Sequence, residues 1–179
     1  MLTLRVSPKE YYDSLSETFV DIPGCIVKLE HSLLAISKWE SVWHKPFISN
    51  KEKERDEVLH YIECMLVDEI DDTSFINYLS QHEMNQIEEY IGNPYTATTI
   101  NNPDTKPNRD VITSELIYYW MVAGQIPFEA EKWHINRLFM LLNICGIKNN
   151  PPKKQSAKTI MSRNRALNEA RKKSMGTSG

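Results

Sequence analysis

Charge is distributed so unevenly along this chain of 179 residues that its last part is not expected to share a core with the rest. Residues 153–179 carry eight bases and one acid, a net charge of +7, whereas residues 1–152 carry 13 bases and 23 acids, a net charge of −10. The formal charge of −3 therefore conceals an acidic body with a basic tail. Such an asymmetry is typical of a segment that binds a polyanion or docks on an acidic partner. The basic residues of the tail are Lys153, Lys154, Lys158, Arg163, Arg165, Arg171, Lys172 and Lys173.

The body is long enough to form a hydrophobic core without metal or disulfides. The chain is 41% hydrophobic and 25% charged, as in an ordinary soluble globular protein. Its three cysteines are odd in number and far apart, so we expect reduced thiols in a cytosolic protein. The N-terminal residues do not predict a signal peptide. The longest apolar run, Leu138 to Ile147, is shorter than the roughly 20 residues that span a bilayer, and no membrane association is expected.

Hydrophobic periodicity divides the chain into three parts. Residues 1–31 contain two stretches with the alternation of a half-buried strand, Leu2–Val6 and Cys25–His31, and they predict a small β element. Residues 32–148 have the spacing of a helical body. Residues 149–179 combine a proline-containing linker with a basic helix whose apolar stripe is thin, so that helix is marginal alone and is expected to become ordered on a partner.

The helical body is predicted from apolar residues that recur every three or four positions. The S-x-x-E sequence from Ser80 to Glu83 has the form of a capping box and marks a helix start. A short connection near Pro127 joins two strongly apolar segments and favours an antiparallel helical hairpin. The predicted fold class is mainly α: a helical domain built on this hairpin, with a small N-terminal β element and an extended basic C-terminal helix. The helices are expected near residues 32–45, 53–67, 75–79, 80–92, 113–124, 128–145 and 157–173.

No catalytic residue, cofactor site or metal site is predicted, so we do not expect an enzyme. The sequence contains no G-x-S-x-G elbow, phosphate-binding loop or dinucleotide fingerprint. His60 and Cys64 are one helical turn apart and could face one metal, but two ligands without a second pair specify nothing. Glu131 and His134 have the Glu-x-x-His spacing of di-iron bundles, which need that motif twice. We expect His134 to be a hydrogen-bonded histidine near the start of a helix.

Partner binding is predicted at two places. Trp39 and Trp43 lie one turn apart among cationic residues and either pack in the core or form a partly exposed aromatic ridge, a feature common at protein interfaces. For Trp120 and Trp133 the core is favoured. The eight basic residues of the tail could contact nucleic acid, an acidic protein or only water. The tail has no aromatic residue to stack on bases and the body is acidic, which argues against nucleic acid.

Several stretches, in this order, resemble tail assembly chaperones of long-tailed bacteriophages. The resemblance covers the chain from about Leu33 to its end. It implies a non-catalytic protein of the host bacterial cytoplasm, absent from the mature virion, which binds the tape measure protein and keeps it soluble while tail tube subunits polymerise around it. The stretches are LLAISKWE at 33–40, KPF at 45–47, ITSELIYYWM at 112–121, IPFE at 126–129, KWHINRL at 132–138 and MSRNRALN at 161–168.

The resemblance also implies the partners and an alternative. Members of this family often have a longer product made by programmed frameshifting, and this chain would be the shorter one. Expected partners are the tape measure protein, the tail tube protein, the longer product and further copies of this chain. The main alternative is a small nucleic-acid-binding or regulatory phage protein that acts through the basic tail, and a third is a component of the virion. Salt separates the first two, because phosphate contacts weaken steeply with ionic strength and apolar contacts do not.

Overall fold

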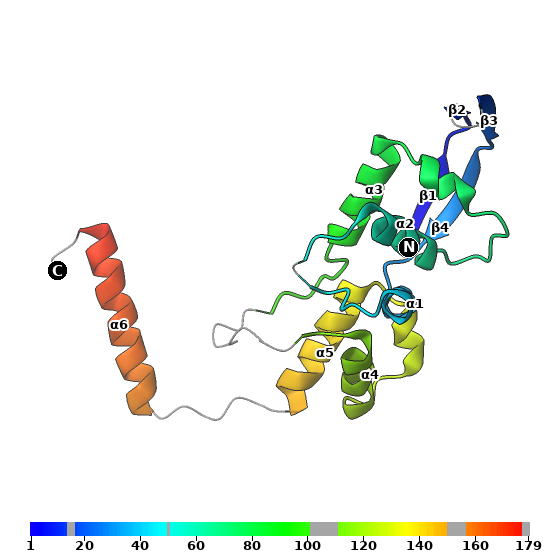
Figure 1. Cartoon of the computed structure of the whole chain (residues 1–179). Helices are drawn as coiled ribbons and strands as arrows, with labels where there is room; N and C mark the ends of the chain where they lie inside the picture. The colour runs from blue at the N-terminus through cyan, green and yellow to red at the C-terminus, as the bar shows by residue number, and fades with distance from the viewer. Residues whose placement is uncertain (14–16, 50, 101–110, 150–156, 177–179) are drawn as a thin grey trace. The chain divides into compact units, whose positions relative to one another are not determined.

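The computed structural model shows a mainly α-helical protein with a small N-terminal β element, as the sequence predicts (Figure 1). The chain forms two compact units, Met1–Cys145 and Gly146–Gly179. The first contains the β element and most of the helices, and the second contains the C-terminal helix. The structure describes residues 1–13, 17–49, 51–100, 111–149 and 157–176.

The β element is one long hairpin made of two ladders. Strand β1 (Leu2–Val6) pairs antiparallel with β4 (Cys25–Leu29), and β2 (Lys9–Asp13) pairs antiparallel with β3 (Thr18–Ile22). Val6 pairs with Cys25 and Lys9 with Ile22, so both ladders keep the same register. The predicted strands correspond to β1 and β4, whereas the outer ladder was not predicted.

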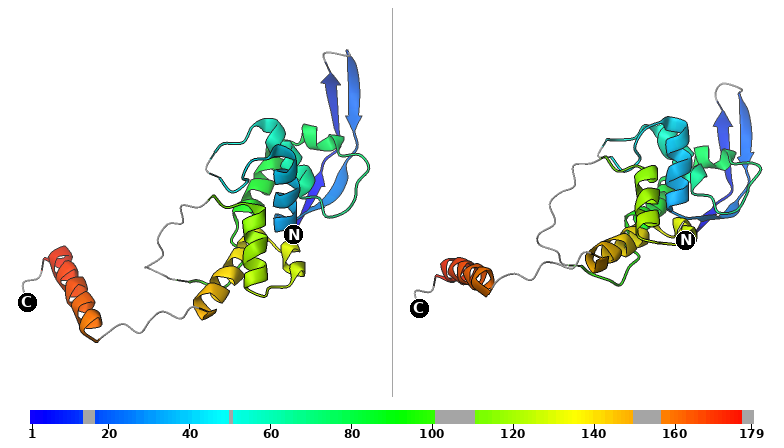
Figure 2. Two further views of the ribbon diagram at one scale, coloured as in Figure 1. Left: turned by 60° about the horizontal axis from the view of Figure 1, so that its bottom comes forward. Right: turned by 90° about the horizontal axis from the view of Figure 1, so that it is seen from below.

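The two ladders are separated at Pro8 and Pro23, which have no amide hydrogen to donate. Gly24 lies beside them, and a Cβ atom there would be only 2.9 Å from Cδ of Pro8. Glycine therefore permits the close approach of the strands at this point. Beyond it, the β2–β3 ladder projects from the helices as an arm (Figures 1 and 2). We call β2 and β3 the arm.

Helix α1 (Leu33–Trp43) is the centre of the helical body. It begins at Ser32, whose hydroxyl accepts a hydrogen bond from the amide of Ala35 at 3.2 Å, a normal N-cap. It packs against α2 (Arg55–Cys64) and α4 (Ser114–Ala123). Its buried residues are Leu33, Ala35, Ile36, Trp39 and Glu40.

The other elements surround this centre or follow it. The 3₁₀ turn η1 (Ser74–Tyr78) packs on α2, and α3 (Gln81–Gly92) packs on β1. A second 3₁₀ turn, η2 (Phe128–Lys132), contacts α1 and leads into α5 (Ile135–Asn149). In the second unit, α6 (Ala157–Met175) lies within the basic stretch of the sequence.

The carboxylate of Glu40 joins α1 to two other segments. Glu40 is buried, and its Oε1 and Oε2 atoms accept hydrogen bonds from the amides of Phe47 and Ser114, each at 2.7 Å. Ser114 is the first residue of α4, where amide groups need acceptors and the helix dipole favours a negative charge. Glu40 therefore holds the loop after α1 and the start of α4 to the centre of the protein.

The predicted single helix over 128–145 is wrong at both ends. Trp133 is extended, with φ −76° and ψ 159°, and it separates η2 from α5. The reason is tertiary: Ser32 and His134 form an isolated β-bridge, and the amide of Ile135 donates to the carbonyl of His31 at 2.7 Å. At the other end, α5 continues to Asn149, one turn beyond the glycine at 146 that was expected to stop it.

Glu83 closes the predicted capping box and also anchors the base of the arm. Its carboxylate accepts from the Ser80 amide at 2.6 Å, from the Lys9 ammonium at 2.6 Å and from the Ser7 amide at 3.2 Å. Burial by itself would raise the pKa of the Glu83 carboxyl, but the hydrogen bonds from Lys9, Ser80 and Ser7 outweigh it and lower the pKa to about 2.

Replacing Glu83 by Gln is expected to cost roughly 1–3 kcal/mol of stability at pH 7 and to flatten the acid limb of the stability curve. The folded pKa lies below the ordinary value of 4.5, so ionised Glu83 stabilises the fold above pH 4.5, and this contribution is lost as the pH falls toward 2. Urea denaturation at pH 7 and pH 3 measures both effects. Glu88→Gln, at an exposed position of the same helix, is the matched control. An equal acid sensitivity of Glu83→Gln and the wild type would contradict this role.

Candidate partner-binding surface

Helix α4 is apolar on most sides but buried on only one. Its inner stripe consists of Ser114, Ile117 and Met121, which are buried. On the outside, Tyr119 is 64% exposed and Val122 is 60% exposed. A helix that is hydrophobic all round is normally buried all round. Within the described part of the chain, the outer side of α4 therefore has apolar surface without cover.

This surface continues onto η2. Phe128 is also exposed, and its ring centroid is 6.2 Å from that of Tyr118. Tyr118 is held in place, because its hydroxyl donates to Oε2 of Glu131 at 2.8 Å. Residues three and four positions apart on a helix are neighbours, so Val122 adjoins both Tyr119 and Tyr118 on the helix surface. We call this the α4 surface: Leu116, Tyr118, Tyr119, Val122 and Phe128.

Helix α5 adds a second incompletely covered apolar segment beside α4 (Figures 1 and 2). Leu138 is fully buried, but among the described residues no side chain of α5 after it is buried. This half of the helix is nevertheless strongly hydrophobic, and each apolar side chain left near water forgoes part of its burial energy. The half-buried residues between 139 and 145 are Phe139, Met140, Leu141, Leu142, Ile144 and Cys145.

The structure separates the two tryptophans of the predicted aromatic ridge. Trp39 is buried and donates from its indole to the backbone carbonyl of Glu57 at 2.8 Å. Its ring is therefore a core element and does not form an exposed ridge. Trp43 stacks on Trp39 with a centroid distance of 6.2 Å and remains half-buried. Trp133, which the sequence favours for the core, is 38% exposed, with the guanidinium of Arg137 4.6 Å from its ring centroid.

The predicted basic residues fall into three groups. Lys153 and Lys154 lie outside the described residues. Lys158 and Arg163 lie within α6, but their side chains are outside the described part of the structure. The remaining four are exposed: Arg165, Arg171, Lys172 and Lys173. Every other side chain of α6 that the structure describes is exposed as well.

His60 and Cys64 lie side by side on α2 and have other partners. Nδ1 of His60 accepts a hydrogen bond from the Trp43 indole at 3.0 Å, and the Cys64 sulfur lies 3.8 Å from Nε2 of the same ring. Burial raises the pKa of the Cys64 thiol to about 11, which disfavours its thiolate form. Among the described residues, no group of three or more His, Cys, Asp or Glu side chains could hold a metal ion.

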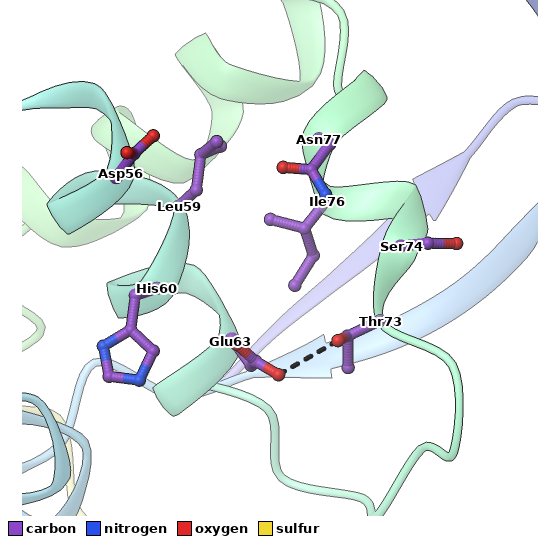
Figure 3. A pocket seen from close by; sticks show the side chains of 8 residues that line it. All are labelled: Asp56, Leu59, His60, Glu63, Thr73, Ser74, Ile76 and Asn77. Carbon is purple, nitrogen blue, oxygen red and sulfur yellow. Dashed lines mark hydrogen bonds between the residues drawn. The ribbon is translucent and has the colours of Figure 1, made fainter. Parts of the chain in front are cut away.

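A polar pocket of about 260 Å³ lies between α2 and η1 (Figure 3). Glu63 is turned toward Thr73, whose hydroxyl donates to its carboxylate at 2.9 Å, whereas the ring of His60 points away from this pair (Figure 3). The polar groups of the pocket do not converge on one point. Its lining residues are Asp56, Leu59, His60, Glu63, Thr73, Ser74, Ile76 and Asn77.

The other buried histidines belong to a hydrogen-bonded cluster. His31 and His134 are in edge contact, with ring centroids 5.1 Å apart. Nδ1 of His31 is 2.5 Å from the Tyr61 hydroxyl, and Nε2 of His134 donates to the carbonyl of Tyr90 at 3.2 Å. Burial, together with the neighbouring His134, lowers the pKa of His31 to about 3. The prediction of a hydrogen-bonded His134 is confirmed, and the cluster links α2, α3 and α5 to the chain before α1.

Comparison with known proteins assigns no family to this fold and surface: no family model, curated protein or solved structure matches the chain. None of the helices in the described part of the chain combines the length and hydropathy that a membrane crossing requires. The α4 surface was not predicted as a site, although its signal is visible in the sequence. Eight of the ten α4 residues, LIYYWMVA, are apolar or aromatic, more than one buried helix face can use.

Proposed function

We propose that this protein is a non-catalytic tail assembly chaperone of a long-tailed bacteriophage, which binds the tape measure protein and keeps it soluble during assembly of the tail tube. The exposed α4 surface carries this proposal, together with the resemblance of the sequence to that family. A surface of this kind fits a long helical client, since an amphipathic helix can lay its apolar face against it. A contiguous exposed apolar patch on a folded protein commonly marks an interaction site.

In this proposal, α4 and α5 form the helical hairpin that the client contacts. The α4 surface supplies the aromatic groups, and the half-buried side chains of α5 widen the apolar contact. Tyr119 and Phe128 are suited to this role, because exposed aromatic rings bury a large area with little loss of conformational entropy. The protein acts in the host cytoplasm, and α6 is an extended basic helix that contacts acidic segments of the client or of the tube protein.

Co-expression with the tape measure protein of the same phage, followed by pull-down at about 0.5 M salt, tests the proposal. We expect a soluble complex that withstands this salt. Tyr119→Glu combined with Val122→Glu should lower the recovered complex at least about tenfold, since it places two charges in an apolar contact. Val42→Glu is the matched control, because Val42 is 59% exposed on α1 but lies outside the α4 surface. A client that stays insoluble with the wild-type protein would contradict the chaperone function.

Binding of nucleic acid through α6 is the second candidate, supported by the exposure of its described basic side chains. If it holds, a labelled oligonucleotide should bind the full chain at about 50 mM salt and be released steeply by about 200 mM salt. Deletion of residues 153–179 should abolish that binding and leave the salt-resistant client complex intact. This pair of results would separate the two functions within one protein.

A further inference from the structure

The arm has an outer face that combines acidic and aromatic side chains. Tyr12 pairs across the ladder with Phe19, and their ring centroids are 5.1 Å apart. Glu10 and Asp21 pair in the same way two residues nearer the body. Side chains at alternate positions of a strand lie on one face, so these four share a face. All four are exposed, with Phe19 at 66% and Tyr12 at 51%.

The inner face of the arm is already engaged by the body. Tyr11 contacts Tyr78 of η1 with ring centroids 5.1 Å apart, and Lys9 forms an ion pair with Glu83 at 2.6 Å. Ile22 is buried, and Val20 packs against the hydrophobic core. The arm is thus held on one side, and its outer face is turned to solvent. Large apolar rings in that position are costly unless a partner covers them.

The chemistry of the outer face selects a cationic partner. Carboxylates form charge-assisted hydrogen bonds with guanidinium and ammonium groups, and aromatic faces attract the same cations. The arm, over residues 9–22, has four acids and one base, a net charge of −3, and that base, Lys9, is paired with Glu83. A basic helix with a few apolar side chains complements both the negative charge and the aromatic rings of the outer face of the arm.

Helix α6 has these properties. Residues 157–175 contain six bases and one acid, a net charge of +5. Arg165 is 84% exposed, and its Nε atom lies 3.7 Å from the carboxylate of Glu169. Leu167 and Arg171 are one turn apart on the same face, and both are exposed. An apolar side chain beside an arginine is the complement of an aromatic ring beside a carboxylate.

We propose that the outer face of the arm binds α6 of a second copy of this chain, so that copies associate head to tail. Each copy carries both surfaces, and because the two surfaces differ, the contact is heterologous. Such a contact repeats from one copy to the next and gives either an open row or a closed ring. The inference goes beyond the proposed chaperone function and does not depend on it. A row of copies is a suitable arrangement for coating a long helical client.

Sedimentation velocity of the full chain without client tests this. Because the contact is ionic, the wild type should form oligomers whose size grows with protein concentration at about 50 mM salt, and these should dissociate at about 500 mM salt. Glu10→Lys with Asp21→Lys changes the net charge of the arm from −3 to +1, and Arg165→Glu with Arg171→Glu reverses two charges on α6 and lowers its net charge from +5 to +1. Each double variant alone should associate at least about tenfold more weakly. Glu88→Lys with Glu89→Lys, exposed on α3, is the charge-matched control and should associate like the wild type.

Mixing the two double variants gives the decisive result. In the mixture, the unchanged basic α6 of the arm variant should bind the unchanged acidic arm of the α6 variant as in the wild type, so the two should at least pair, and contact between the two altered surfaces should extend the assembly. All four substitutions in one chain should restore extended association. A wild type that is monomeric at all concentrations, an association that salt does not weaken, or a mixture that does not pair would overturn the proposal. The client pull-down is scored separately, so failure of one proposal does not imply failure of the other.

Discussion

At pH 5 the folded protein is expected to be about 2 kcal/mol less stable than at pH 7, mainly because of His31. Its pKa is about 3 in the folded state, against an ordinary value of 6.5. Below pH 6.5 the unfolded chain binds a proton that folded His31 does not accept. His31 therefore lowers the free energy of unfolding only below pH 6.5, and this loss of stability grows as the pH falls toward 3. This is a large part of the 5–15 kcal/mol typical of a domain.

The physical cause is the place of His31 in the fold. The ring is buried against His134, beside the hydroxyl of Tyr61. Burial also lowers the pKa of His134, so that residue acts in the same direction. The carboxylate of Glu30 acts on His134, but it already accepts a hydrogen bond from the Tyr90 hydroxyl at 2.5 Å and is paired with the N-terminal ammonium. A charged imidazolium would have to share this site with a second histidine, at the cost of leaving water.

Denaturant titrations of the wild type and His31→Gln at pH 7 and pH 5 measure the effect. Glutamine can still bond to Tyr61 but does not titrate, so the variant should lose about 1–2 kcal/mol at pH 7 and at least half of the pH dependence. His82→Gln is the control, because His82 is exposed on α3. The assignment fails if His31→Gln retains the full loss of stability between pH 7 and pH 5.

Glu40→Ala is expected to destabilise the fold by about 2–5 kcal/mol, since it leaves one buried and one partly buried amide without an acceptor at roughly 1–3 kcal/mol each. These are the amides of Phe47 and Ser114, each 2.7 Å from a carboxylate oxygen. Glu40→Gln should cost about half as much, because its remaining carbonyl oxygen can serve one of them. The loss should loosen the start of α4, which carries the α4 surface.

Urea denaturation measures the loss in the free energy of unfolding, and amide hydrogen exchange shows which amides lose protection. In Glu40→Ala, the amides of Phe47 and Ser114 should exchange faster than the other protected amides, relative to the wild type. Glu88→Ala, on the exposed side of α3, should change neither quantity by more than about 0.5 kcal/mol. A loss below about 1 kcal/mol, with unchanged exchange at both amides, would show that water replaces the carboxylate.

Local signals in the sequence, such as capping residues and glycines at helix ends, were sufficient to predict where some helices begin and end. The Ser80–Glu83 capping box was predicted correctly, because both partners lie within one turn of the chain. The ends of α3 and α4 were placed at Gly92 and Gly124 for the same reason. The break before α5 was missed, since it depends on the bridge between Ser32 and His134, about one hundred residues apart.

The candidate sites also divide into those that the sequence predicts and those that only the tertiary structure shows. The basic tail can be identified from composition, because charge adds along the chain regardless of conformation. The α4 surface and the outer face of the arm cannot, because hydrophobic residues look alike in a sequence whether another helix or only solvent covers them. Trp39 and Trp133 illustrate this: each was assigned from its spacing, and the structure buries the first and exposes the second.

What the sequence alone determined about this protein was a mainly helical fold with a small N-terminal β element, and a charge distribution that gives an acidic body and a basic tail. These follow from periodicity, capping residues and net charge, all of which act within a few residues. Only the tertiary structure decided that the outer ladder projects as an arm, that Glu40 and His31 are buried among partners, and that one side of α4 is left uncovered. Each of these depends on which distant segments compete for the same buried space, and that competition is settled only when the whole chain packs.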